Sequence, residues 1–205
     1  ELAPIRFVEW LNNYNYGFIR RGLFGTLSFI VSKNLKIDIF ILILIFQTFF
    51  YSLFYFFSLK ILLNIKEISF TFLLVLLSPL GFTYPLSETA AIGRQEIIFL
   101  SFTGLFFYSL LKNKKTISQL VLFILIPISL LTHEGSIVYL PYLILANFLF
   151  LNKDKIKINL ILIIYTILLI ILFVLSIDKN VLYVESICLE LSNKINFEEC
   201  KNLNG

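Results

Sequence analysis

The residues best suited to chemistry stand in a few short polar strings within an apolar chain. His133 and Glu134 are adjacent, and His133 is the chain's one histidine. An imidazole beside a carboxylate has the chemistry of a general base, a metal ligand or a proton relay. The structural alternative is a turn in which Glu134 caps the next helix or pairs with an arginine. A divalent metal would be compatible with this pair, but no second group of ligands supports one, so we predict neither a metal site nor a cofactor.

A second string, Gly93-Arg94-Gln95-Glu96, stands at the start of an apolar run. A helix that runs from about Glu88, in a turn that offers an N-cap, to Leu111 would place Arg94 and Glu96 near one membrane boundary. The two charges would either pair and stabilise the helix start or line a water-filled cavity, where ionisable residues at membrane depth are usually found. Glu96 and Glu88 would have supporting roles at such a site.

Two further candidates lie nearer the N-terminus. Arg20 and Arg21 precede a glycine-rich helix start, so their guanidinium groups and the first backbone N–H groups together would hold a phosphate or pyrophosphate. Anchoring to anionic lipid headgroups is the alternative for this pair. Glu9 is a candidate base in the same segment, and an exposed loop acid is the alternative for it.

Six apolar runs supply the elements that must position these residues. A helix needs roughly 20 residues to cross a hydrocarbon core, and runs 37–59 and 158–177 reach that length alone. Four others reach it with uncharged neighbours or a locally thinner bilayer: 68–82, 97–111, 117–131 and 135–151. The hydrophobic share of 59% and the mean hydropathy of +0.90 leave too little polar sequence to coat a soluble globule. We therefore predict an all-α, polytopic transmembrane helix bundle of about six spans.

The segment before the first span has a different pattern. Over 17–32, Arg21, Gly25 and Ser28 recur at helical spacing while apolar residues gather on another face. This pattern predicts an amphipathic helix that lies in the membrane interface or enters it as a re-entrant segment. The predicted organisation is an extracytoplasmic entry segment, a six-span bundle and an extracytoplasmic tail, at 1–36, 37–177 and 178–205.

Lysine placement orients the bundle. The loops at 60–67, 112–115 and 153–157 hold eight lysines and two acidic residues, so the positive-inside rule places them in the cytoplasm. The opposite, extracytoplasmic face then receives four arginines, five lysines, the histidine and eleven of the thirteen acidic residues. The net charge of +4 and the pI near 9.0 reflect this topology, and we predict no nucleic-acid partner.

Two observations concern the ends of the sequence. Cys188 and Cys200 lie in the polar tail on the extracytoplasmic side, where we expect a disulfide in preference to two free thiols. The sequence contains no methionine, and we expect it to be part of a longer protein.

Four short motifs of the chain carry a resemblance: Trp10, Tyr16-Gly17-Phe18-Ile19-Arg20-Arg21-Gly22-Leu23, Gly93-Arg94-Gln95-Glu96 and His133-Glu134-Gly135. In these motifs the chain resembles polytopic membrane proteins of bacterial surface-polysaccharide clusters, such as O-antigen and exopolysaccharide polymerases. A related likeness is to the large membrane glycosyltransferases that use polyprenyl-phosphate-linked sugars. These carry a carboxylate and an interfacial helix in their first extracytoplasmic loop, where Glu9 and the helix after Arg20-Arg21 would stand. The chain departs from them in having no aspartate before Asp38.

The resemblance implies an enzyme of the bacterial inner membrane that transfers sugars at the extracytoplasmic face from a polyprenyl-(pyro)phosphate donor. The phosphate-binding residues would be Arg94, Arg20 and Arg21, and the base would be Glu134, His133 or Glu9. The expected partners are the lipid-linked saccharide, membrane lipids and other polysaccharide-assembly proteins. The alternatives are a transporter or flippase for the same saccharide and a non-catalytic membrane subunit whose charges pair internally. Few polar residues stand in the middles of the spans, which favours an enzyme at the outer face.

Overall fold

The described part of the chain is helical. The computed structural model describes residues 10–15, 18, 21–65, 94–150, 156–176 and 189, and these include no strand. The helices in chain order are α2 (Gly22–Leu35), α3 (Ile39–Leu62), α6 (Glu96–Leu111), α7 (Lys115–Thr132), the 3-10 helix η1 (Glu134–Tyr139), α8 (Leu140–Phe150) and α9 (Ile156–Ser176). The all-α prediction is confirmed for these residues.

Five of the six predicted apolar runs coincide with these helices, and the run 68–82 lies outside the described residues. In the described part, α3 and α7 are long and apolar enough to cross a membrane. Three further stretches are apolar but shorter, at Glu96–Leu111, Gly135–Phe150 and Asn159–Leu175. Helices α3 and α6 end where lysine and asparagine interrupt the apolar sequence, at Asn64 and at Lys112 and Asn113.

The entry helix begins and ends later than its predicted range of 17–32. Arg21 (φ 61°, ψ 20°) and Lys36 (φ 53°, ψ 33°) both adopt the left-handed backbone conformation, which interrupts a right-handed helix at either end of α2. Asp38 then begins α3, where its Oδ1 accepts a hydrogen bond from the backbone N–H of Phe40 at 2.8 Å.

Two other predicted boundaries are wrong. The helix expected from about Glu88 begins at Glu96, and its first turn is closed by the N–H of Ile98, which donates to the carbonyl of Gln95 at 3.0 Å. The fifth run begins as η1 and becomes α-helical only at Leu140. The N–H of Ser136 donates to the carbonyl of His133 at 2.9 Å, and such bonds three residues apart wind the chain into the tighter 3-10 form.

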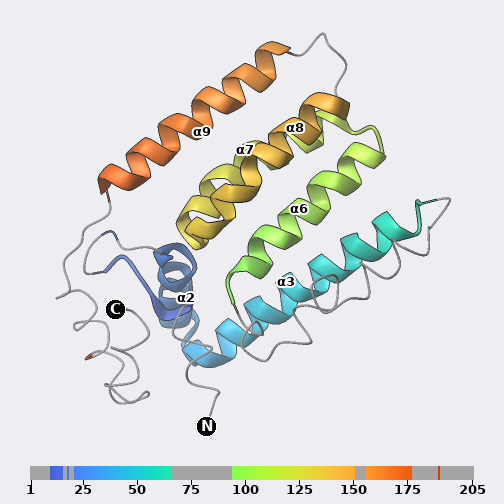
Figure 1. Ribbon diagram of the computed structural model, residues 1–205. Coiled ribbons are helices and arrows are strands. Elements are labelled where there is room, and N and C mark those ends of the chain that lie inside the picture. Colours follow the sequence, from blue (N-terminus) through green and yellow to red (C-terminus); the bar gives the residue numbers. More distant parts are fainter. Residues whose placement is uncertain are drawn as a thin grey trace.

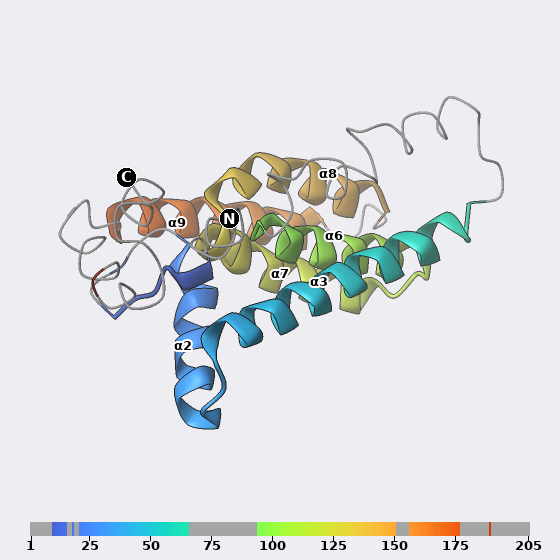
Figure 2. The same cartoon turned by 90° about the horizontal axis from the view of Figure 1, so that it is seen from below.

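The long helices run side by side and α2 crosses them. Figure 1 shows α3, α6, α7 and α9 in sequence across the molecule, with α8 over α7. Helix α6 packs against both α3 and α7, and α7 also packs against α9. Figure 2 shows α2 standing across the direction of these helices at one end, where it packs against α3 and α7.

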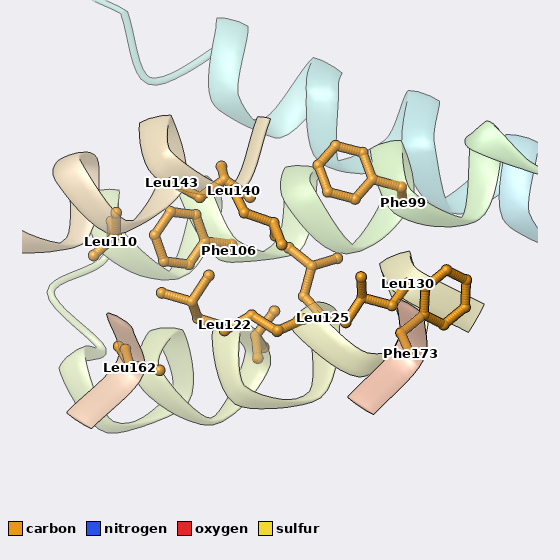
Figure 3. Close-up of a cluster of buried hydrophobic side chains, with 12 residues drawn as sticks. Phe99, Phe106, Leu110, Leu122, Leu125, Leu130, Leu140, Leu143, Leu162 and Phe173 are labelled. Carbon is orange, nitrogen blue, oxygen red and sulfur yellow. The ribbon is translucent and has the colours of Figure 1, made fainter. Parts of the chain in front are cut away.

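Two clusters of buried apolar side chains hold the helices together. The first joins the entry segment, α2, α3 and the start of α6, and includes Trp10, Phe24 and Ile98. The second lies among α6, α7, α8 and α9, and Figure 3 shows its leucine and phenylalanine side chains converging between these helices. The first cluster therefore ties the N-terminal segment to the beginning of α6.

The outward faces of the helices are apolar as well. Along α9 the exposed side chains include Ile164 at 57%, Leu168 at 55% and Leu172 at 53%. Helix α2 buries Phe24 and Ser28 and exposes Leu27 and Ile30, so apolar side chains lie on both of its faces. These surfaces are suited to a lipid environment, because exposing apolar area to water costs about 25 cal/mol for each Å².

Charged residues separate to the two ends of the long helices. Lys112, after α6, donates from Nζ to Oδ1 of Asn64, after α3, at 3.0 Å. Lys114 stands in the same α6–α7 connection, and Lys115 is the first residue of α7. Arg94 and His133 stand at the opposite end, where α6 begins and α7 has ended. Among the described residues, four lysines therefore lie at the end opposite Arg94 and His133, whereas Lys33 and Lys36 belong to α2 and its C-cap.

Candidate functional site

Three of the predicted site residues meet at the end of the bundle where α6 begins. Nε2 of His133 lies 3.0 Å from Oε1 of Glu96, and Nη1 of Arg94 lies 3.5 Å from the same oxygen. Glu96 is therefore the central member, with the imidazole and the guanidinium on one carboxylate oxygen. We call Arg94, Glu96 and His133 the ionic triad.

The antiparallel packing of α6 and α7 produces this meeting. Glu96 is the first residue of α6, and α7 ends at Thr132, so the start of one helix lies beside the end of the other. His133 then adopts an extended backbone (φ −156°, ψ 104°) before η1 begins. This break in helical structure directs the imidazole toward the first turn of α6.

The triad is partly accessible. The side chain of Arg94 is 49% exposed, that of Glu96 27% and that of His133 17%. Within the described residues, Oε2 of Glu96 and Nδ1 of His133 are buried atoms without a hydrogen-bond partner. A buried polar atom without a partner is costly, so both atoms have capacity for a ligand or a water molecule.

The backbone of Gly135 approaches the imidazole closely. A Cβ atom at this position would lie 2.9 Å from Cε1 and 3.1 Å from Nδ1 of His133. Both separations are shorter than an ordinary van der Waals contact, so the absence of a side chain at Gly135 leaves the space that the ring occupies.

The entry segment lies at the same end of the bundle. Trp10 and Leu11 belong to one buried cluster with Ile97 and Ile98, which directly follow Glu96. On the other side, the ring of Phe18 meets the ring of Phe173 from α9 edge-on, with centroids 6.1 Å apart. Arg21 follows this segment at the start of α2. The fold thus places the described part of the entry segment, with Arg21, at the end that holds the triad.

Hydrogen bonds and close packing attach this segment to α2. The N–H of Tyr14 donates to Oγ1 of Thr26 at 2.9 Å, and that hydroxyl donates to the carbonyl of Gly22 at 2.8 Å. Burial raises the pKa of Tyr14 from its ordinary value of 10.0 to about 12. The phenol is therefore neutral over the physiological range of pH.

The other predicted site residues have different outcomes. Glu134 begins η1, and its side chain lies outside the description. Glu9, Arg20, Glu88 and the two cysteines of the predicted disulfide, Cys188 and Cys200, also lie outside the described residues. The sequence pointed to His133 and the adjacent Glu134 as a candidate site. In the fold, His133 also contacts Glu96, which belongs to another helix.

Sequence reasoning did not assign a role to Gly135 or a partner to His133. Gly135 stands in the string His133-Glu134-Gly135, which was a visible signal. The contact with Glu96 has no counterpart in the spacing of the residues, because it depends on how α6 and α7 pack.

The described residues contain no group of three or more His, Cys, Asp or Glu side chains that could hold a metal ion. No family model, curated protein or solved structure matches the chain. The chemistry of the site follows from the imidazole, carboxylate and guanidinium groups of the ionic triad.

These groups provide two complementary functions. A carboxylate that accepts a hydrogen bond from one nitrogen of an imidazole orients the ring and leaves the second nitrogen basic. A half-exposed guanidinium binds phosphate or carboxylate oxygens and keeps its charge at any physiological pH. The triad can thus remove a proton and stabilise an anion within one small region.

Proposed function

We propose that the protein is a multi-pass membrane glycosyltransferase that transfers a sugar from a polyprenyl-(pyro)phosphate donor at the extracytoplasmic face of the bacterial inner membrane. The observation that carries the proposal is the contact of Arg94, Glu96 and His133 at one end of an apolar helical bundle. In this proposal α3, α6, α7, η1 with α8, and α9 are five of six spans, and run 68–82 is the other.

An amphipathic substrate would match this arrangement. Its polyprenyl chain would lie among lipids beside the apolar outer faces of helices such as α9. Its phosphate groups would lie at the boundary, where Arg94 would bind them together with Arg21 and Arg20. Stabilising charge that develops on a leaving phosphate is commonly the largest single contribution to such a reaction.

The base would be His133, because its imidazole contacts Glu96 and thereby stands next to the arginine. Glu96 in turn lies within 3.5 Å of the guanidinium of Arg94, so base and anion site are adjacent. Removal of the acceptor hydroxyl proton by a positioned base contributes about 10²-fold to 10⁴-fold to a rate.

Buried polar groups favour an enzyme over a transporter. A transporter would need a polar route between the two ends of the helices. Oγ1 of Thr103 in α6 is buried without a hydrogen-bond partner among the described residues. Two other buried hydroxyls of the described spans bond to nearby backbone carbonyls: Oγ of Ser101 donates to Ile97 at 2.7 Å, and Oγ1 of Thr166 donates to Leu162 at 2.7 Å. Hydroxyls that are satisfied in this way offer little to a passing sugar.

The decisive experiment incubates the purified protein in proteoliposomes with a panel of polyprenyl-pyrophosphate-linked disaccharides and measures chain extension. We expect extension by the unmodified protein, a loss of about 10²-fold to 10³-fold in Arg94→Lys, and a comparable loss in His133→Ala. Lysine keeps the charge of arginine but loses its paired donors. Lys114→Arg, at the opposite end, is the matched control and should retain full activity.

Two outcomes would contradict the proposal. Normal extension by Arg94→Lys would remove Arg94 from the mechanism. Movement of a labelled lipid-linked disaccharide across the bilayer without a new glycosidic bond would identify a transporter.

A further inference from the structure

Glu96 limits the way in which the imidazole of His133 carries its proton. Nε2 lies 3.0 Å from a carboxylate oxygen, which is a hydrogen-bond acceptor and has no proton to give when ionised. In the neutral imidazole, Nε2 must therefore hold the hydrogen for this contact to be a hydrogen bond. The other nitrogen, Nδ1, then carries the lone pair.

The contact of Nε2 with Glu96 therefore assigns the tautomer. Nδ1 is buried and has no hydrogen-bond partner among the described residues, so its lone pair can accept a hydrogen bond from a ligand. A bare nitrogen in the same place is the group that a substrate hydroxyl could approach as a donor.

Gly135 maintains the ring position that this hydrogen bond requires. An added Cβ would lie 2.9 Å from Cε1 and 3.1 Å from Nδ1, and the imidazole would have to move away from it. Gly135 does not adopt a left-handed backbone conformation that would itself demand glycine. The lack of a side chain at Gly135 therefore leaves room for the imidazole ring of His133.

We propose that Glu96 and Gly135 are positioning residues that hold the neutral imidazole of His133 as its Nε2–H tautomer and leave Nδ1 as the basic atom of the site. The inference deepens the proposed function and rests on it for the reaction. There, the acceptor hydroxyl gives its proton to Nδ1, and its oxygen bonds to the anomeric carbon of the donor. The bond from that carbon to the phosphate oxygen breaks, and the electron pair leaves with the phosphate at Arg94.

The test uses the fact that the chain contains one histidine. Labelling the chain of residues 1–205 with ¹⁵N-histidine and recording NMR spectra in nanodiscs at alkaline pH yields the signals of His133 alone. We expect a bare Nδ1 and an Nε2–H proton that exchanges slowly with water. Glu96→Ala should abolish that slow exchange because the acceptor is gone, and Gly135→Ala should abolish it because the ring is displaced.

Val138→Ala is the matched control, since Val138 is an exposed residue of the same 3-10 helix, at 67% exposure. It should leave the spectrum unchanged. A protonated Nδ1 in the neutral ring, or a slowly exchanging Nε2–H that persists in Gly135→Ala, would overturn the inference.

Activity provides a second measurement that separates this inference from the proposed function. With the same panel of lipid-linked disaccharides, Gly135→Ala should lower kcat by about 10²-fold and leave KM for the donor unchanged, because the arginines are intact. In a His133→Ala background the same substitution should have no further effect. If the NMR result is as expected but no disaccharide is extended by the unmodified protein, the proposed function is wrong and the positioning of His133 stands.

Discussion

Asn147 of α8 and Asn159 of α9 share a hydrogen bond between buried amides, in which Nδ2 of Asn147 donates to Oδ1 of Asn159 at 2.8 Å. Their side chains are 0% and 5% exposed, on helices whose other faces are apolar. An amide that lost its partner in such surroundings would have no water to replace it. The pair therefore fixes how α8 packs on α9.

Replacing this pair should reveal an energetic coupling. Asn147→Leu and Asn159→Leu should each lower the Tm of the detergent-solubilised protein, and the double variant should lose less than the sum. The coupling expected for such a bond within a membrane protein is about 0.6 kcal/mol, with measured values up to about 1.7 kcal/mol. Thr166→Val is the control, because its hydroxyl bonds within α9, and its effect should be small. Strictly additive losses would show that the amides act independently.

Labelling with a membrane-impermeant maleimide tests the proposed topology. In a background with Cys188→Ser and Cys200→Ser, Asn34→Cys on α2 should react in intact cells. Lys114→Cys, in the α6–α7 connection, should react only after the membrane is permeabilised. Both positions are exposed in the fold, so a difference in labelling reports the membrane side and not burial. Reaction of Lys114→Cys in intact cells would overturn the orientation.

Gly25→Ala should release the entry segment from α2. A Cβ at Gly25 would overlap the backbone carbonyl of Asn12, which cannot rotate away as a side chain can. Trp10, the chain's one tryptophan, is fully buried in the adjoining cluster and reports on this packing. We expect stronger acrylamide quenching of its fluorescence and a cost of about 1–3 kcal/mol in stability.

The control for this experiment is Gly104→Ala, whose Cβ would approach Phe57 between α3 and α6, away from the entry segment. It should leave the quenching of Trp10 unchanged. If Gly25→Ala also leaves it unchanged, then the contact between Gly25 and Asn12 does not hold the segment in place.

Alkaline pH should loosen the same segment. The pKa of Tyr14 is raised from 10.0 to about 12 by burial, so the fold favours the neutral phenol. The contribution of the neutral Tyr14 phenol to the free energy of unfolding is complete below about pH 10 and is lost as the pH rises toward about 12. Quenching of Trp10 should therefore increase over that range in the unmodified protein and less in Tyr14→Phe.

At neutral pH, Tyr14→Phe should behave as the unmodified protein does, because the phenol oxygen has no hydrogen-bond partner in the described residues. Tyr142→Phe is the control, since Tyr142 is 68% exposed. It should leave the alkaline transition unchanged. A transition that is identical in Tyr14→Phe would assign the effect to another group.

The sequence by itself determined the helices and the separation of charge. Uninterrupted apolar runs located α3, α6, α7 and α9 closely, because burying or lipid-solvating such a run favours helix over any structure with unpaired backbone groups. It also singled out Arg94, Glu96 and His133, because charges are costly beside so much apolar sequence. The bounds of α2 differ from the predicted ones, since the left-handed conformations at Arg21 and Lys36 depend on local packing that composition does not encode.

Only the tertiary structure decided which of these residues meet. Glu96 and His133 are separated by two helices in sequence, and their 3.0 Å contact exists because α6 and α7 pack antiparallel. The same holds for the hydrogen bond between Asn147 of α8 and Asn159 of α9. Hydropathy and periodicity describe each segment alone, whereas a contact between side chains depends on the rotation and register of two helices, which their mutual packing sets.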